Sequence, residues 1–411
     1  MCKYSIKATT FCGIYVDGDR ERKPYEADAY INQLGHYCVD NEYALARYSQ
    51  EYFFEHPTWP TEWKSQSVFM AWQDYLYTGN TDFLVQYYDK LKNEKALLQP
   101  LNEKGLLVCT YSGNRKNDIV DWPMSERDGY ELKEINLVPN AFYYKSLVIM
   151  ADIAKVLGEK ADCRFFTQKA RSLKTAINQQ FFDPQKGLYV DAVGSNHVSL
   201  HGNMFPLAFG LVENKYKPHL IQFIKSRRMA CSVYGAQYLL EALYQENEAE
   251  YALILLQEGG ERSWLNMLKS GSTITLEAWD IKFKPNLDWN HAWGAAPANI
   301  IPRQLFGIQP TSAGFSTFSI KPQTAGLRFG EIKTPTLKGD IIVKFTNDRL
   351  QKSYMLELEI PVNTKAELFM PNPYGGKLFV NGKALSKKCK NGFFQFHLSP
   401  GNYKISTINN K

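Results

Sequence analysis

The spacing of apolar residues changes near residue 315, and this change divides the chain into two parts with different secondary structure. Before residue 315, apolar residues recur at intervals of three and four, as in YEADAYINQLGHYCV (residues 25–39) and NAFYYKSLVIMADIAKVLG (140–158). This period predicts helices that bury one face or more. About twelve such segments follow one another before the change.

After residue 315 the period becomes two. GDIIVKFTND (339–348) and SYMLELEIP (353–361) alternate apolar and polar residues, and Gly, Pro and Asn separate such segments. Alternation of this kind predicts strands with one buried face. Residues 315–411 are therefore expected to form a small antiparallel β-sandwich.

The helical segments differ in how much of their surface is apolar. Some are amphipathic, whereas others, such as Tyr143 to Ala154, are apolar on most sides. Alternation of wholly buried and half-exposed helices predicts two concentric layers, so the fold class is mainly α. We expect an (α/α)6 toroid over residues 1–314, followed by the β-sandwich. MCKYSIKATTF at the start is typical of the last turns of a helix, so the first helix is expected to be incomplete.

Composition excludes several classes of protein. Hydrophobic residues make up 44% of the chain, which supports a large core. Residues 316–411 hold 15 Lys and Arg against 6 Asp and Glu, a surplus of +9 within a total of +6. These lysines are scattered among strands and turns, so neither a nucleic-acid partner nor a membrane partner is predicted. No apolar run is long enough to span a bilayer or to act as a signal peptide. If the source is bacterial, a periplasmic or a cytoplasmic location is expected. Nothing in the sequence indicates an oligomeric state.

No cofactor or metal is expected. The seven cysteines are dispersed without C-x-x-C spacing, which favours neither a zinc site nor a disulfide framework. Asp17, Asp19 and Glu21 have the spacing of the first ligands in an EF-hand calcium loop, but Arg22 stands where the EF-hand turn requires glycine. Phosphate-binding loops and serine-nucleophile motifs are also missing from the sequence.

Three loops distant in sequence share a composition of acids, arginines and aromatic residues. They are residues 15–28, residues 118–131 (DIVDWPMSERDGYE, with five carboxylates) and residues 271–280 with the following LDWNHAWGAAP. Loops at one rim of a toroid converge on its central cavity. Acids and arginines bind sugar hydroxyls and aromatic rings cover sugar C–H faces, so the three loops together predict a sugar site. Hydrolysis of a glycosidic bond then needs one protonated and one ionised carboxyl group.

These segments also resemble a known family. YVDGDRERKPYEADAYINQ (15–33), HPTWPTEW (56–63), DIVDWPMSERDGYE, TITLEAWD (273–280) and NHAWGAAPANIIPRQLFGIQP (290–310) are similar to bacterial α-L-rhamnosidases of glycoside hydrolase family 78. The resemblance covers nearly the whole chain. It implies an (α/α)6 catalytic barrel that removes terminal α-L-rhamnose with inversion and without a metal at the catalytic centre.

The resemblance also assigns roles to residues. By motif, the general acid falls on Glu126, within D-W-x-x-x-E, and the general base falls on Glu277, within T-x-x-x-E-x-W. Glu277 stands in an apolar stretch, where a lone acid needs a partner or a purpose. Inversion would place the two carboxyl groups roughly 6.5–9.5 Å apart.

The remaining expected site residues surround this pair. Asp121 and Asp128 would keep Glu126 protonated, although Arg127 against Glu126 would lower its pKa. Another carboxylate is expected after the acid, as Glu131 or Glu134. The substrate-binding residues are then Asp19, Arg20, Asp121, Trp122, Arg127, Asp128, Tyr130, Glu134, Trp279, His291 and Trp293.

Other functions stay open at this stage. A different glycosidase or a polysaccharide lyase could use the same toroid, and Tyr130 with His291 could form the Tyr/His pair of a lyase. The chain could also be a truncated, non-catalytic binder of rhamnose-containing glycans, because members of the family carry β-domains before the barrel. The expected partner is in each case a rhamnose-containing oligosaccharide or glycoside, or a related glycan.

Overall fold

An inner ring of buried helices forms the centre of the helical domain. In the computed structural model, which describes residues 1–409, six helices make up this ring. Each contacts the next, and the last contacts the first, so the ring closes. They are α2 (Glu26–Val39), α4 (Gln66–Thr78), α6 (Leu137–Leu157), α8 (His201–Ala208), α10 (Val233–Gln245) and α13 (Pro297–Ile300).

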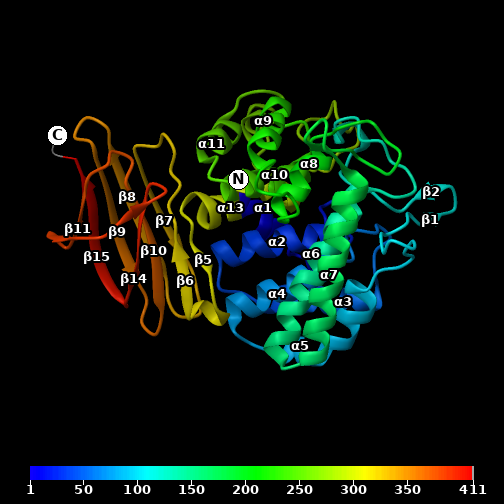
Figure 1. Ribbon diagram of the computed structural model, residues 1–411, viewed down its shortest axis with the longest axis horizontal. Helices are drawn as coiled ribbons and strands as arrows, with labels where there is room; N and C mark the ends of the chain where they lie inside the picture. Colours follow the sequence, from blue (N-terminus) through cyan, green and yellow to red (C-terminus); the bar gives the residue numbers. More distant parts are fainter. Residues whose placement is uncertain (410–411) are drawn as a thin grey trace.

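The outer layer consists of helices that bury only one face. In α7 the buried residues Phe166, Ala170, Leu173 and Ile177 recur every three or four positions, which is the pattern of an amphipathic helix. Figure 1 shows α7 lying along α6 on the outside of the domain. The outer helices are α1 (Cys2–Ala8), α3 (Ala44–Glu55), α5 (Asp82–Lys90), α7 (Lys160–Phe181), α9 (Lys217–Arg227), α11 (Ala249–Gln257) and α12 (Trp264–Lys269).

Local sequence signals account for several helix ends. The Ser232 side chain accepts hydrogen bonds from the backbone N–H groups of Tyr234 and Gly235 and so caps the start of α10. Helix α6 ends at Gly158, whose φ of 80° is the left-handed conformation that glycine adopts most readily. Shorter helical turns fill the connections: η1 (Leu91–Ala96), η2 (Met124–Glu126), η3 (Ala292–Ala295), η4 (Ile301–Leu305) and η5 (Ala313–Phe315).

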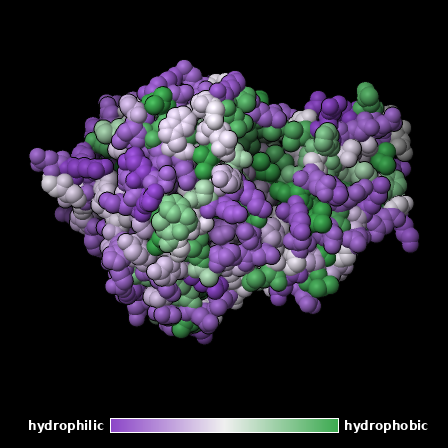
Figure 2. Space-filling model, turned by 180° about the vertical axis from the view of Figure 1, so that it is seen from behind, coloured by the Kyte–Doolittle hydropathy of each residue, from purple (hydrophilic) through white to green (hydrophobic). Residues whose placement is uncertain are grey.

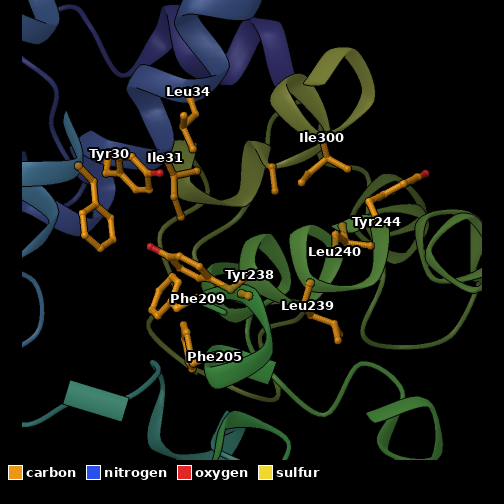
Figure 3. Packing of buried hydrophobic residues seen from close by; sticks show 14 of the residues in the cluster. Tyr30, Ile31, Leu34, Phe205, Phe209, Tyr238, Leu239, Leu240, Tyr244 and Ile300 are labelled. Carbon is orange, nitrogen blue, oxygen red and sulfur yellow. The ribbon is translucent and has the colours of Figure 1, made fainter. Parts of the chain in front are cut away.

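Aromatic and aliphatic side chains of the inner helices meet at the axis of the toroid. Figure 3 shows Tyr30 and Ile31 of α2 facing Tyr238 of α10, with Phe205 of α8 beneath them. The Phe205 and Tyr238 rings are 5.0 Å apart between centroids. The Tyr238 hydroxyl donates to Gln66 Oε1 at 3.1 Å, so the buried hydroxyl is satisfied. The toroid therefore has a packed core, and a ligand has room only at a rim.

The C-terminal part is a sandwich of two sheets (Figure 1). One sheet has the order β13-β14-β10-β6-β5 and the other β12-β11-β15-β9-β8-β7. All pairs are antiparallel except β6 with β10, which is parallel. The strands are β5 (Gln309–Pro310), β6 (Thr317–Ile320), β7 (Phe329–Thr334), β8 (Ile341–Asp348), β9 (Ser353–Ile360), β10 (Lys365–Pro371), β11 (Lys377–Val380), β12 (Lys383–Leu385), β13 (Cys389–Lys390), β14 (Phe393–Leu398) and β15 (Gly401–Ile408).

The two parts pack closely together. The Phe315 and Tyr77 rings are 5.0 Å apart, edge to face, and Gly314 lies against the backbone of Gly79 at the end of α4. The sheet already includes β5, so it begins slightly before the boundary expected at residue 315. Seen from behind, hydrophilic residues cover most of the surface and hydrophobic residues gather between the helical part and the sheets (Figure 2). None of the described helices is both long and apolar enough to cross a membrane.

Candidate active site

A pocket of about 330 Å³ opens where several loops of the helical domain meet. The loops precede α2, precede α4, precede α6 and follow α12. Its size is at the lower end for ligand pockets, which suits one sugar residue held at the end of a chain. Its walls are Asp17, Arg20, Glu21, Tyr25, Asp28, Trp59, Trp63, Arg115, Ile119, Trp122, Glu277, Lys284, Asn286, His291 and Trp293.

A larger groove of about 1040 Å³ lies beside α1 and α3. Its exposed lining is mainly apolar, and it contains none of the residues expected to bind substrate or to catalyse. The smaller pocket, which gathers acids, cations and indole rings, is therefore the candidate active site.

Close contact between two distant loops assembles the acidic part of the pocket. Gly18 pairs with His291 in a short antiparallel bridge. A Cβ atom on Gly18 would overlap the Asn290 carbonyl oxygen and the Asp288 carboxylate, so the approach depends on glycine. The backbone N–H of Arg20 donates to Asp288 Oδ2 at 2.7 Å. These contacts hold the loop before α2 against the loop that carries Glu277.

Glu277 is buried and held from several sides. Its Oε2 accepts from the Asp288 N–H at 2.8 Å and lies 3.0 Å from Lys284 Nζ. The same oxygen is 3.5 Å from a terminal nitrogen of Arg20. The Trp293 ring N–H donates to the Glu277 carbonyl oxygen at 3.0 Å. Two cations and a backbone N–H thus surround this carboxylate.

Glu21 is the second carboxylate beside Arg20. Its Oε1 is 3.0 Å from the same Arg20 nitrogen, and its Oε2 accepts from the Tyr25 hydroxyl at 3.0 Å. One guanidinium nitrogen thus contacts both Glu21 and Glu277, and the two oxygens lie no farther apart than the sum of these contacts. About a third of the Glu21 side chain is exposed, against 6% for Glu277. Glu21 stands at the mouth and Glu277 farther inside.

The floor of the pocket contains buried polar atoms that have no hydrogen-bond partner within residues 1–409. They are Asp28 Oδ1, His291 Nδ1 and Trp63 Nε1. Burial, with Asp17 and Glu277 nearby, raises the pKa of Asp28 well above its usual range, and burial lowers the pKa of His291. Unsatisfied buried polar groups are costly. A ligand with several hydroxyl groups would satisfy them.

Asp17 adds a further acid to this floor. Its Oδ1 accepts from the Lys23 N–H at 2.9 Å, and burial raises its pKa to about 7. Glu21 and Asp288 act in the same direction by repulsion. The acids of the pocket therefore do not all ionise together near neutral pH.

Indole rings line the sides. The His291 and Trp293 rings are 4.5 Å apart between centroids, and Trp293 meets Trp63 edge to face at 6.3 Å. Trp59 and Trp122 stand at the mouth, where the Arg115 guanidinium lies 3.9 Å above the Trp59 ring. Such rings provide the apolar faces against which a sugar packs.

The structure does not place Glu126 in this pocket, contrary to the expectation from the motif. Its carboxylate is buried and forms a bidentate pair with Arg262 at 2.7 and 2.9 Å. Burial raises the pKa of Glu126, but Arg262 opposes that shift. Arg262 also lies over the Phe283 ring, so the pair connects two surface loops. The partner of Glu126 is thus Arg262 and not the adjacent Arg127.

Most of the other acids in the 118–131 loop hold the loop in place. Asp121 is buried, and His201, Ser232 and the Trp122 N–H bind its carboxylate. Arg127 donates to the Asp121 carbonyl oxygen at 2.8 Å, and Asp128 pairs with Arg227. The acids that sequence reasoning assigned to the sugar are therefore largely part of the scaffold.

Four further residues expected to bind substrate also lie outside the pocket lining. The Tyr130 hydroxyl donates to the Asp191 carbonyl oxygen, which separates it from His291 and from a lyase-type pair. The Trp279 ring is fully buried and donates to the Cys231 carbonyl oxygen at 2.7 Å. Asp19 pairs with Arg22 on the surface, and Glu134 is exposed. Arg20, Trp122, Glu277, His291 and Trp293 do line the pocket.

Comparison with known proteins agrees with this architecture. Residues 1–305 match the bacterial alpha-L-rhamnosidase 6 hairpin glycosidase domain, and residues 307–383 match the bacterial alpha-L-rhamnosidase C-terminal domain. The chain belongs to the bacterial α-L-rhamnosidase family. The resemblance seen in the sequence, the helical six-hairpin domain and the C-terminal β-sheet domain are thereby confirmed.

The relatives of this family member are distant and longer. Two curated α-L-rhamnosidases of Formosa agariphila are 24% and 25% identical over 371 and 369 residues. The matches cover 84% of this chain but only 37% and 38% of those proteins, so the chain spans less than half of their length.

Solved structures show the same fold. The α-L-rhamnosidase from Dictyoglumus thermophilum superposes with a TM-score of 0.85 at 17% identity, over 99% of this chain and 49% of that one. The Streptomyces avermitilis α-L-rhamnosidase, complexed with L-rhamnose, gives a TM-score of 0.76 at 16% identity, over 99% of this chain and 41% of that one.

Several pocket residues of this rhamnosidase-family chain escaped sequence reasoning. Glu21 and Asp17 lie in a loop that the composition singled out, but within it the choice fell on Asp19 and Arg20. Trp59 and Trp63 lie in the HPTWPTEW segment that carried part of the resemblance. Isolated basic residues such as Arg115 and Lys284 gave no signal. Among residues 1–409 no cluster of three or more His, Cys, Asp and Glu is placed to hold a metal ion.

Proposed function

We propose that this chain removes terminal α-L-rhamnose from rhamnosides by hydrolysis with inversion at the anomeric carbon. The observation that carries the proposal is the pair Glu21 and Glu277, which contact one Arg20 nitrogen inside a pocket of a rhamnosidase-family fold. Two carboxyl groups in one sugar pocket are the usual requirement for glycoside hydrolysis, and the facing oxygens of this pair lie at most about 6.5 Å apart, at the short end of the spacing for inversion. Apart from the shared Arg20, Tyr25 holds Glu21, whereas Lys284 and the Asp288 N–H hold Glu277.

Glu277 is proposed as the general base. Lys284, Arg20 and the Asp288 N–H hold its carboxylate in place, and its buried position lets it hold one water molecule against the ring. Glu277 takes a proton from this water as the water oxygen bonds to the anomeric carbon.

Glu21 is proposed as the general acid in place of Glu126. Its position at the mouth is where the leaving group must depart, because buried residues close the floor. As the glycosidic bond breaks, Glu21 gives its proton to the leaving oxygen, and solvent can restore that proton. Glu126 does not line the pocket, so it does not fit this step.

Binding of the sugar is assigned to the floor and walls. Asp28, His291 and Asp17 would bind ring hydroxyls, while Trp63 and Trp293 would cover the C–H faces and the methyl group of rhamnose. Two rhamnosidase structures similar in fold, from Streptomyces avermitilis and Klebsiella oxytoca, hold L-rhamnose or rhamnose. We propose that the pocket of the present chain binds the same sugar.

The test is hydrolysis of an aryl α-L-rhamnoside, with the first product anomer observed by proton NMR. Initial release of β-L-rhamnose, lost on Glu277→Gln, supports the proposal. A second substrate, whose cleavage needs no general acid, distinguishes the role of Glu21 from that of Glu277. A dinitrophenyl rhamnoside has a good leaving group that needs no proton. The rate loss caused by Glu21→Gln should therefore be at least about 10²-fold smaller on this substrate than on an alkyl rhamnoside. Initial release of the α anomer, or no turnover with intact rhamnose binding, would overturn the proposal.

A further inference from the structure

Arg115 is a cation of the pocket that has no acidic partner among the described residues. The other two cations of the lining are paired, Arg20 with Glu21 and Glu277, and Lys284 with Glu277. Arg115 instead places its guanidinium 3.9 Å above the Trp59 ring and 6.0 Å from the centre of the Trp122 ring. Its side chain is exposed, so it is available to a ligand from solvent.

The hairpin that carries Arg115 is firmly attached to the domain. Strands β1 (Tyr111–Ser112) and β2 (Arg115–Lys116) pair across a two-residue turn, at the right of Figure 1. Lys116 Nζ donates to the carbonyl oxygens of Leu132 and Lys133 at 2.8 and 3.2 Å. The Thr61 N–H donates to the Asn117 carbonyl oxygen at 3.0 Å, which joins the hairpin to the loop of Trp59. Arg115 and Trp59 are therefore presented together.

The position of this pair relative to the two carboxylates defines what it can contact. The rhamnose ring must enter the closed floor, where Asp28, His291 and Trp63 are buried. The group bonded to the anomeric oxygen must then lie toward the mouth, which Trp59, Arg115 and Trp122 line. These residues thus face the part of the substrate that leaves.

We infer that Arg115, Trp59 and Trp122 form the subsite for the leaving group, and that this group is an acidic sugar, a uronate. The inference rests on the proposed function. A guanidinium binds a carboxylate through two parallel N–H groups, and stacking on Trp59 fixes its plane. The half-buried indole of Trp122 offers a face to the C–H side of the same sugar. A neutral aglycone would leave the guanidinium without a charged partner.

The experiment compares one disaccharide in two forms, α-L-rhamnosyl glucuronate and its methyl ester. The ester keeps the linkage and shape but removes the charge. The expected result is a kcat/KM about 10- to 100-fold higher for the acid, the range of a charge-assisted hydrogen bond. Arg115→Gln should abolish this preference and Arg115→Lys should keep part of it. Arg171→Gln, an exposed arginine of α7, is the matched control and should change neither value.

Two further measurements separate this inference from the proposed function. In two cases the uronate subsite is overturned while the hydrolase proposal stands. In the first, the parent cleaves the aryl rhamnoside but cleaves the acid and the ester at equal rates. In the second, Arg115→Gln slows cleavage of the acid and of the ester alike. If nothing is cleaved, the hydrolase proposal fails. Calorimetry of the acid and ester with the parent chain then decides the subsite, because only the acid should lose affinity on Arg115→Gln.

Discussion

Asp28 and His291 face each other in the floor of the pocket, with Oδ1 and Nδ1 3.4 Å apart, and neither atom has a hydrogen-bond partner within the described residues. Burial raises the pKa of the carboxyl group and lowers that of the imidazole, so both directions favour neutral forms. Two polar groups placed this way cost stability. We interpret them as pre-set for the hydroxyl groups of a sugar.

Asp28→Asn should therefore raise the stability of the fold and weaken the binding of rhamnose. The amide removes the ionisable group from an acidic, buried setting, so thermal unfolding at pH 8 should move to higher temperature. The affinity for L-rhamnose should fall about 10- to 100-fold, because an NH2 group that only donates replaces one of the two oxygens that can accept from the sugar. Calorimetry with rhamnose and a thermal melt measure the two effects. Asp89→Asn, on the exposed face of α5, is the control, and unchanged rhamnose affinity in Asp28→Asn would contradict the interpretation.

Glu126→Gln should lower stability more than activity. The substitution leaves the partly buried Arg262 without its ionic partner, so the free energy of unfolding should fall by about 1–3 kcal/mol. Turnover of an aryl rhamnoside should stay within about tenfold of the parent, whereas Glu277→Gln should lose at least about 10²-fold.

The matched variant for this prediction is Arg262→Gln, alone and combined with Glu126→Gln. The double variant should be less destabilised than the sum of the two single variants, because they remove one interaction. If Glu126→Gln folds normally but abolishes turnover while Arg262→Gln does not, Glu126 acts in catalysis after all.

Asp17 should make stability depend on pH. Burial raises its pKa to about 7 from an ordinary value of 3.8, so the folded state holds a proton that the unfolded state has released. This contribution to stability is complete at low pH and is lost as the pH rises from 3.8 to about 7. Asp17→Asn keeps an acceptor for the Lys23 N–H but removes the titration.

The measurement is the free energy of unfolding of parent and Asp17→Asn at pH 5 and pH 8. The parent should lose more stability between the two values than the variant, by about 1–3 kcal/mol. Glu62, whose pKa is raised by burial and by Asp118, titrates alike in both chains. The pKa of Asp28, which Asp17 helps to raise, should fall in the variant. An identical loss in parent and variant would show that Asp17 ionises freely.

The fold followed from the sequence because periodicity reports burial. The ring helix α2 is buried on nearly all sides and α7 on one, which is the contrast that predicted two layers. The parallel pairing of β6 with β10 was not predicted, since alternation shows which residues are buried but not which strand is the neighbour.

The site was harder to predict because motif composition does not show the direction of side chains. The 118–131 loop is rich in acids, yet His201, Ser232 and Arg262 bind Asp121 and Glu126 from other helices and loops. These partners lie between 80 and 136 residues away along the chain, so no local pattern reveals them. Glu277, which the sequence singled out as a lone acid in an apolar stretch, does line the pocket, because that signal does not depend on where its partners come from.

Gly18 gives the last prediction, since the proposed chemistry requires the two acidic loops to touch. Gly18→Ala would push the loop of Glu21 away from Asn290 and Asp288, and with it the Arg20 N–H that Asp288 accepts. A misplacement of about 1 Å costs roughly 10²-fold in rate when positioned groups must act together. We therefore expect kcat/KM on the aryl rhamnoside to fall about 10²-fold. Gly259→Ala is the control, because its added Cβ would make only ordinary contacts of 3.5 Å or more, and it should keep the parent rate. A parent-like rate in Gly18→Ala would mean that Glu21 and Glu277 do not need this loop contact to react.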